Sequence, residues 1–314
     1  MKDNLIVDSA PHLHKGESTA KIMWVVVASL IPAGLAGVFI FGATALGVIV
    51  LAVTSALFTE VILDILTKRK ITVLDGSAMI TGILLAYNLP PKAPFWLPII
   101  GSFVAISIGK HIFGGLGQNI FNPALVGRVF LMASWPKYMT TWLNPRWQVD
   151  TISSATPLAI LKEGKLAEKI SNINLFLGNR AGCIGEVCIL ALLLGALFLF
   201  WKGYISWHIP ITYIATVGIF TYVFSPGGFF RGEWLFHILS GGLILGAFFM
   251  ATDYVTSPLT RKGQIVFGVG CGLLTAIIRL WGGYPEGVSY AILMMNAAVP
   301  VIDRYSKNRV YGRK

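Results

Sequence analysis

The stretch GSAMITG (residues 76–82) has a counterpart in SGGLILG (residues 240–246), and this pair decides the fold that the sequence predicts. A Gly-Gly pair at 114–115 and another at 282–283 follow at similar distances along each half. Five apolar segments per half would give the two halves opposite orientations in a bilayer. Inverted repeats of this kind form the midplane sites of many transporters. Because Gly-rich apolar segments also resemble each other by chance, the repeat alone is a weak signal.

The composition of the chain is typical of a polytopic membrane protein. Of its 314 residues 55% are hydrophobic and 12% charged, and the mean hydropathy is +0.72, which is too apolar for a soluble domain. The apolar segments are 22–41, 43–63, 77–89, 96–112, 119–135, 186–201, 207–224, 235–251, 264–281 and 288–302. Several are shorter than the roughly 20 residues of a simple span. We expect an all-α protein of about ten transmembrane helices, some of them interrupted around a site within the membrane.

The distribution of basic residues among the loops predicts on which side of the membrane the termini lie. In short loops on the side opposite the termini only Lys92, Arg231 and Arg279 occur, so the positive-inside rule predicts that both termini are cytoplasmic. Further basic residues in the central connection count against this assignment, which rests on the short loops. The net charge of +11 therefore indicates membrane lipid as the surroundings and no nucleic-acid partner. The start of the chain lacks the features of a cleaved signal peptide.

This topology divides one integral membrane domain, 1–314, into five parts. They are a cytoplasmic segment 1–21, a first five-helix repeat 22–135, an extracytoplasmic connection 136–182, a second five-helix repeat 183–303 and a basic cytoplasmic tail 304–314. The connection is longer than a structureless loop in a compact protein usually is, so we expect it to be functional.

The polar stretch DTISSATPLAILK (residues 150–162) lies in the middle of that connection. Thr is a favoured N-cap and Pro a favoured first helical residue, so Thr156 is predicted to cap a helix over 157–170. An anion at Thr156 would face free backbone N–H groups and the positive end of the helix dipole. An ordinary capping threonine on a surface helix is the alternative.

A second candidate stretch is GKHIFGGLGQNIFNPALVGRVF (residues 109–130). Arg128 falls within an apolar segment, where a charge is costly and usually faces a cavity or a partner, so it is a candidate for holding a polar ligand. The alternatives are that it snorkels to the interface or pairs with an acid such as Glu186 or Asp253.

Acidic residues near the ends of apolar segments form a third group of candidates. Asp253, in FFMATDYVTSPLTRKG (residues 248–263), could bind a cation or a ring N–H, or could simply lie beside Arg261 and Lys262. For the other acids near predicted membrane boundaries we expect interfacial solvation rather than an ion path. These are Glu60, Asp64 and Glu186. For Glu286, which precedes the last apolar segment, the same alternatives stay open as for Asp253.

Metal, haem and nucleotide chemistry are not expected. The five His residues have no ligand spacing, the three Cys residues form no CxxC pair, and no phosphate-binding or nucleophile motif occurs.

The stretch D-x-x-S-S-A-T-P-L-A resembles the flavin-attachment motif of the D subunit of Rnf-type ferredoxin:NAD oxidoreductases and of the B subunit of sodium-pumping NADH:quinone reductases. GGLGQNIFNPALVGRVF, ATDYVTSP and GGYPEGVSYAILMMNAAVPVIDRY also resemble D-subunit segments, from about residue 75 to residue 305. Two departures are Ser154, where the family usually has Gly, and Tyr254, where Pro is common.

The resemblance implies FMN on Thr156 through a phosphoester, attached by an extracytoplasmic flavin transferase, with Asp150, Ser153 and Ala155 as recognition positions. It also implies a noncovalent riboflavin and a fold similar to urea and ammonium transporters. Candidates for the flavin pocket are Arg128, Asn119 and Asn122. Candidates for contacts to the second flavin or an ion are Asp253, Thr256 and Ser257.

The resemblance further implies a redox protein that is not catalytic alone, in the inner membrane of a bacterial cell. Electrons would pass from the FMN of the G subunit through this chain toward the NAD-reducing C subunit, coupled to Na⁺ or H⁺ movement, in an Rnf complex that also holds the A, B and E subunits. A cofactor-free channel of the urea or ammonium type is the alternative from another class, and a purely structural scaffold is a third. The stretch at 150–156 separates them, since a channel has no use for a flavin acceptor.

Overall fold

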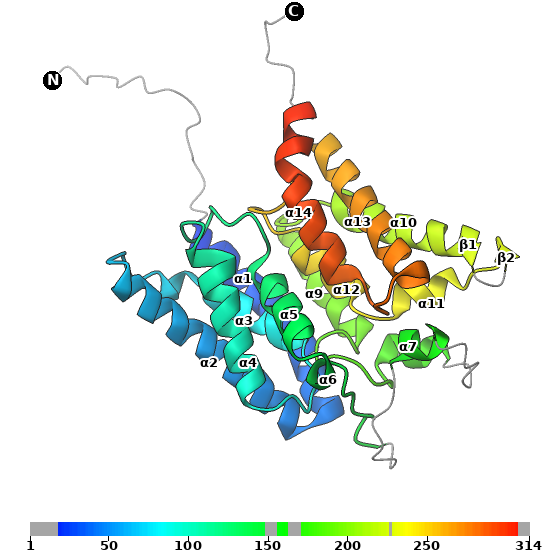
Figure 1. Ribbon diagram of the computed structural model, residues 1–314, viewed down its shortest axis with the longest axis horizontal. Helices are drawn as coiled ribbons and strands as arrows, with labels where there is room; N and C mark the ends of the chain where they lie inside the picture. Colours follow the sequence, from blue (N-terminus) through cyan, green and yellow to red (C-terminus); the bar gives the residue numbers. More distant parts are fainter. Residues whose placement is uncertain (1–17, 148–155, 163–170, 226–227, 307–314) are drawn as a thin grey trace, which may run out of the picture.

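A computed structural model describes residues 18–147, 156–162, 171–225 and 228–306, and shows a mostly helical protein (Figure 1). In the first half the helices are α1 (Thr19–Phe41), α2 (Ala43–Leu66), the 3-10 helix η1 (Val73–Asp75), α3 (Ser77–Tyr87), α4 (Trp96–Ile106), the π-helix η2 (Ser107–His111), α5 (Pro123–Ser134) and α6 (Pro136–Met139).

In the second half the helices are α7 (Pro157–Lys162), α8 (Asn172–Leu177), α9 (Ile189–Lys202), α10 (His208–Val223), α11 (Trp234–Leu239), α12 (Leu243–Leu245), the π-helix η3 (Gly246–Met250), α13 (Arg261–Trp281) and α14 (Val288–Tyr305). Strands β1 (Phe224–Ser225) and β2 (Gly228–Phe229) pair in antiparallel fashion, with Phe224 opposite Phe229.

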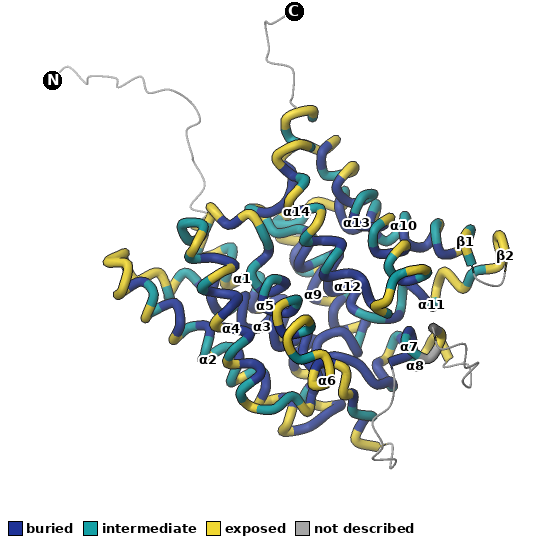
Figure 2. Tube along the Cα trace, in the orientation of Figure 1, coloured by how far each residue is buried: buried dark blue, intermediate teal, exposed yellow. Residues whose placement is uncertain are grey.

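Within the described residues, three helices are long and apolar enough to cross a membrane, namely α1, α2 and α13. Shorter apolar helices are α3, α5, α9 and α10. The outer faces of the long helices are apolar as well, with Leu35, Phe39 and Phe58 each more than 60% exposed, and Figure 2 shows exposed stretches along the periphery. The structure therefore agrees with a polytopic membrane protein, while the total of ten spans stays a prediction.

The helices of the two halves pack in a similar order. In the first half α2 packs against α3 and α4, and α4 against α5; in the second half α10 packs against α11 and α13, and α13 against α14. Contacts between α1 and α9 join the halves (Figure 1). This order agrees with two repeats of one unit, but both the repeat and its inverted orientation stay predictions.

The two quoted stretches begin alike and then diverge. Gly76 precedes α3 with φ +85°, and Gly241 has φ +67° between α11 and α12, a left-handed conformation that glycine adopts without strain. After Gly76 the chain forms the regular helix α3, whereas after Gly241 it forms one short turn and then the π-helix η3. The predicted segment 235–251 is thus an interrupted helix, as expected for a segment that contains adjacent glycines.

Candidate functional site

A cavity of about 280 Å³ lies between the start of α7, helix α5 and the loop that leads into α14. Thr156, Arg128 and Glu286 line it together with aromatic side chains, and we call it the Thr156 cavity. The aromatic residues are Trp142, Tyr284 and Tyr290. The rings of Tyr284 and Tyr290 stack with centroids 5.0 Å apart. The cavity thus combines flat apolar surfaces with one cation and one carboxylate.

Thr156 caps α7 as the sequence predicts. Its Oγ1 accepts a hydrogen bond from the N–H of Ala159 at 3.3 Å, and Pro157 begins the helix. The side chain is only 4% exposed, so in this structure the threonine lines the cavity. The predicted helix over 157–170 is described as far as Lys162, and the recognition positions Asp150, Ser153 and Ala155 lie outside the described residues.

Arg128 reaches the same cavity from α5. This helix begins at Pro123 because the side chain of Asn122 caps it, accepting from the N–H of Leu125 at 3.3 Å. The guanidinium is 4% exposed, donates from Nη1 to Asn88 Oδ1, and pairs through Nη2 with Glu286 Oε2. Snorkelling to the interface is therefore wrong for Arg128, and its acidic partner is Glu286.

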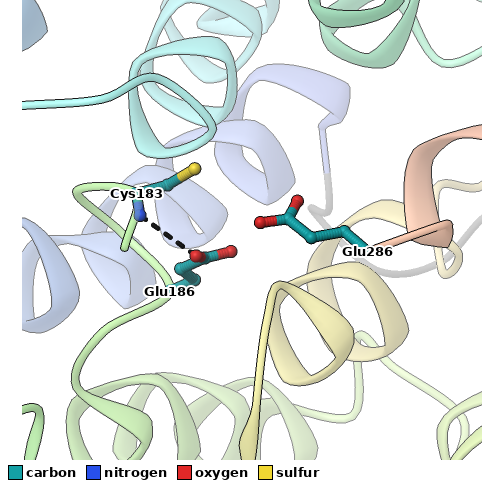
Figure 3. Close-up of side chains that lie close together, drawn as sticks. All are labelled: Cys183, Glu186 and Glu286. Atoms are coloured by element: carbon teal, nitrogen blue, oxygen red, sulfur yellow. Dashed lines mark hydrogen bonds between the residues drawn. The ribbon is translucent and has the colours of Figure 1, made fainter. Parts of the chain in front are cut away.

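Glu186 and Glu286 form a buried carboxylate pair with Cys183 beside it (Figure 3). The two glutamates are 2% and 8% exposed, so the expectation of interfacial solvation is wrong for Glu186. Glu186 Oε1 accepts from the N–H of Cys183 at 3.0 Å. Burial, and then the negative charge of Glu286, raise the pKa of Glu186, which lies in the loop before α9.

Arg279, in the last turn of α13, is buried next to this pair and bonds to backbone carbonyls. Nε donates to the carbonyl of Glu286 at 3.1 Å and Nη2 to that of Ser240 at 3.1 Å, while Nη1 donates to the carbonyl of His237. Because Arg279 lies within α13 and is only 5% exposed, the prediction that it lies in a short loop is wrong.

A second cavity, of about 100 Å³, lies near the start of α1 and the loop after η3, and we call it the Asn122 cavity. It is lined by Asn119, Asn122 and Asp253 together with Ser77 and Lys110. The structure therefore separates Asn119 and Asn122 from Arg128, with which the predicted flavin pocket grouped them, and brings them to Asp253 instead. Burial raises the pKa of the Asp253 carboxyl.

Hydrogen bonds connect the remaining predicted residues to this second cavity. Thr256 Oγ1 donates to Asp253 Oδ2 at 3.1 Å, and the carbonyl of Thr256 accepts from Asn296 Nδ2 at 2.8 Å. Asn296 Oδ1 in turn accepts from the N–H of Asn122 at 3.3 Å. Ser257 is buried next to Thr256 but does not line the cavity.

A buried ion pair adjoins the Asn122 cavity. Lys110 Nζ lies 2.6 Å from Glu60 Oε1 and donates to Ser77 Oγ at 2.6 Å. Asp64 lies close by and accepts from the N–H of Thr72 at 3.0 Å. Glu60 and Asp64 are 0% and 2% exposed, so interfacial solvation is also wrong for these two acids.

Comparison with known proteins gives a single consistent result. Residues 6–312 match the profile of a family described as the NQR2, RnfD, RnfE family. The chain is 50% identical to the D subunit of the Na⁺-translocating ferredoxin:NAD⁺ oxidoreductase complex of Acetobacterium woodii, over 98% of this chain and 96% of that protein. It is 49% identical to the D subunit of the proton-translocating ferredoxin:NAD⁺ oxidoreductase complex of Clostridium ljungdahlii, over 100% and 98%. It is 38% identical to the D subunit of the ion-translocating oxidoreductase complex of Salmonella arizonae, over 98% of each.

Proposed function

Since the chain belongs to the NQR2, RnfD, RnfE family, we propose that it is the D-type membrane redox component of an ion-translocating ferredoxin:NAD⁺ oxidoreductase complex. It works with the other components of that complex and is not catalytic alone. The relatives at 50% and 49% identity are named for sodium and for protons respectively. The transported ion is accordingly assigned only as a monovalent cation, Na⁺ or H⁺.

The Thr156 cavity supports FMN attached to Thr156 through a phosphoester. Its volume of about 280 Å³ is close to the lower end of the 300–1,000 Å³ that is typical of ligand pockets. The rings of Trp142, Tyr284 and Tyr290 suit the faces of a planar heterocycle, and Arg128 suits its electron-rich edge. The observation that carries the proposal is that the threonine of the flavin-attachment stretch lines the same cavity as the buried Arg128.

A bound flavin supplies one- and two-electron transfer, and the protein sets its potential through nearby charge and hydrogen bonds. In the Thr156 cavity the nearby charged groups are the Arg128 guanidinium and the Glu286 carboxylate, which form an ion pair. Arg128, Thr156 and Glu286 are buried, which limits the access of water to the polar part of the cavity. The role of this chain is therefore to bind, orient and tune an electron carrier.

The Asn122 cavity is our candidate for the noncovalent riboflavin. Its polar lining offers amide, carboxyl, hydroxyl and ammonium groups that match the edge and the ribityl hydroxyls of that molecule. At about 100 Å³ it is smaller than typical ligand pockets, so binding requires apolar lining side chains such as Leu116 to move. Asp253, Thr256 and Asn122 would position the ligand through the hydrogen-bond chain described above.

One preparation tests both assignments. Protein purified from a host that has the flavin transferase should show flavin fluorescence in a denaturing gel, and Thr156→Ala should abolish this signal. Thr141→Ala removes an exposed threonine of the same connection and should keep it. Flavin released on denaturation should be riboflavin, at about one per chain, and should survive in Thr156→Ala.

The result that contradicts the proposal is equally specific. Wild-type protein without covalent flavin, in a host whose transferase modifies a known acceptor, would exclude FMN attachment at Thr156. If such protein also carried urea or ammonium into vesicles, the cofactor-free channel would take its place.

A further inference from the structure

The carboxylate pair described above joins two distant parts of the chain. Glu186 comes from the loop before α9, and Glu286 from the loop between α13 and α14. An oxygen of each, together with Cys183 Sγ, lies within 4.8 Å of the others. Figure 3 shows the two carboxyl groups pointing toward each other. Two acids buried at this separation need a physical explanation, because like charges repel strongly where water is scarce.

Each carboxyl group has one oxygen that is satisfied and one that is not. Glu186 Oε1 accepts from the Cys183 N–H, and Glu286 Oε2 is paired with Arg128. Glu186 Oε2 and Glu286 Oε1 are buried and have no hydrogen-bond partner among the described residues. A buried oxygen without a partner is unfavourable. A proton held between the carboxyl groups, directly or through a water molecule, supplies the missing donor.

The charged groups around the pair favour a proton over a metal ion. Arg128 of α5 neutralises Glu286, Arg279 of α13 donates to the carbonyl of Glu286, and Arg180 Nη2 donates to the carbonyl of Glu186 at 2.8 Å. Cys183 faces the pair as a neutral thiol, since burial raises its pKa. Three guanidinium groups repel an additional divalent cation, whereas one proton on Glu186 leaves Glu286 as the partner of Arg128.

We propose that Glu186 and Glu286 share one exchangeable proton, and that the pair binds this proton more strongly when an electron enters the Thr156 cavity. The second part rests on the proposed function. Glu286 is common to both features, since it lines the cavity and belongs to the pair. An additional negative charge in the cavity competes with Glu286 for Arg128. The carboxyl pair then holds a proton more strongly.

The step is balanced in charge. One electron leaves a reduced flavoprotein donor and enters the cavity, and a pair that has released its shared proton at raised pH takes one proton from the aqueous phase. When the electron moves to the next carrier, that proton returns to the aqueous phase. No bond between heavy atoms forms or breaks in this chain.

Infrared spectroscopy of the purified protein tests the proton site without requiring flavin. We expect the carbonyl band of one protonated carboxyl group per chain at neutral pH, shifted in D₂O and lost reversibly as the pH is raised. Glu186→Gln and Glu286→Gln should each abolish this band. Glu233→Gln, which makes the same change at an exposed position, should leave it. No such band in the wild type, or a band that survives in both pair variants, would overturn the site.

A redox titration of flavin-loaded protein tests the coupling. The midpoint potential of the covalent flavin should fall as the pH rises in the wild type, and this dependence should weaken in Glu186→Gln. The same dependence in wild type and variant would overturn the coupling while leaving the infrared result intact. If Thr156 carries no flavin, the proposed function and the coupling fail together, and the infrared band still decides whether the pair binds a proton.

Discussion

Arg128 shows how one buried charge can serve two purposes. It holds Asn88 and Glu286 simultaneously, and so connects the end of α3 with the loop before α14. It also presents a cation to the Thr156 cavity. A lysine could supply the charge but not the planar fork that bonds to two acceptors.

Arg128→Ala should destabilise the protein by about 3–5 kcal/mol, because it leaves Glu286 buried without its partner. It should also lower flavin content or shift the flavin reduction potential. Thermal unfolding of detergent-solubilised protein and flavin quantification measure the two effects.

The matched control removes both charges. Arg128→Met combined with Glu286→Gln leaves no unpaired buried charge, so it should be more stable than Arg128→Ala alone. If Arg128→Ala lowers stability but leaves flavin content and potential unchanged, Arg128 has only a packing role.

At the scale of helices, the contact between α1 and α9 joins the two halves. Gly195 in α9 packs against α1 so closely that a Cβ atom there would overlap the carbonyl oxygen of Ser29. Small residues of this kind allow helix backbones to approach each other in membrane proteins.

Gly195→Ala should therefore destabilise the fold by about 1–3 kcal/mol, because the backbone of α1 cannot move aside as a flexible side chain would. Gly47→Ala is the matched control, since Gly47 lies within α2 and a Cβ atom there meets nothing within 4 Å. That change should be neutral or stabilising by up to about 1 kcal/mol. Equal melting temperatures for the two variants would contradict the close contact.

At the scale of the whole molecule, the start of α1 and the end of α14 lie on one side, and α6 and α7 on the opposite side (Figure 1). This arrangement fits an even number of crossings, with α7, which follows the proposed flavin-attachment residue Thr156, on the side away from the start of α1 and the end of α14.

We expect protease to remove a tag on either terminus in inside-out vesicles and not in right-side-out vesicles. Thr141→Cys, at an exposed position after α6, should react with a membrane-impermeant thiol reagent from the outside of intact spheroplasts. Wild-type protein gives the background of its three native cysteines. Labelling only in inside-out vesicles would reverse the predicted topology.

Most helices were predictable from the sequence, because a run of apolar residues by itself indicates a segment that is buried in protein or lipid. The predicted segments 22–41 and 264–281 differ from α1 and α13 mainly at their starts, where each helix includes polar residues such as Lys21 and Arg261. The cap at Thr156 was also predictable, since capping depends on neighbouring residues.

The carboxylate pair was not predictable, because its members are brought together by the fold. Arg128, which neutralises Glu286 in the pair, is 158 residues away from it in the sequence. Nothing near Glu186 or Glu286 in the sequence distinguishes a buried acid from a solvated one. The only sequence feature that pointed to a buried acid was Arg128, because a charge within an apolar segment requires a partner. It did not indicate which acid that partner is.

The three bonds of Arg279 have a mechanical consequence. Two of them hold the carbonyls of His237 and Ser240, where α11 stops, and the third holds the carbonyl of Glu286. A single guanidinium from α13 thus links the end of α11, where the helix is interrupted before α12, to the loop that carries Glu286. A shift of this loop would therefore either break the bond from Arg279 Nε or require the end of α11 to move with it.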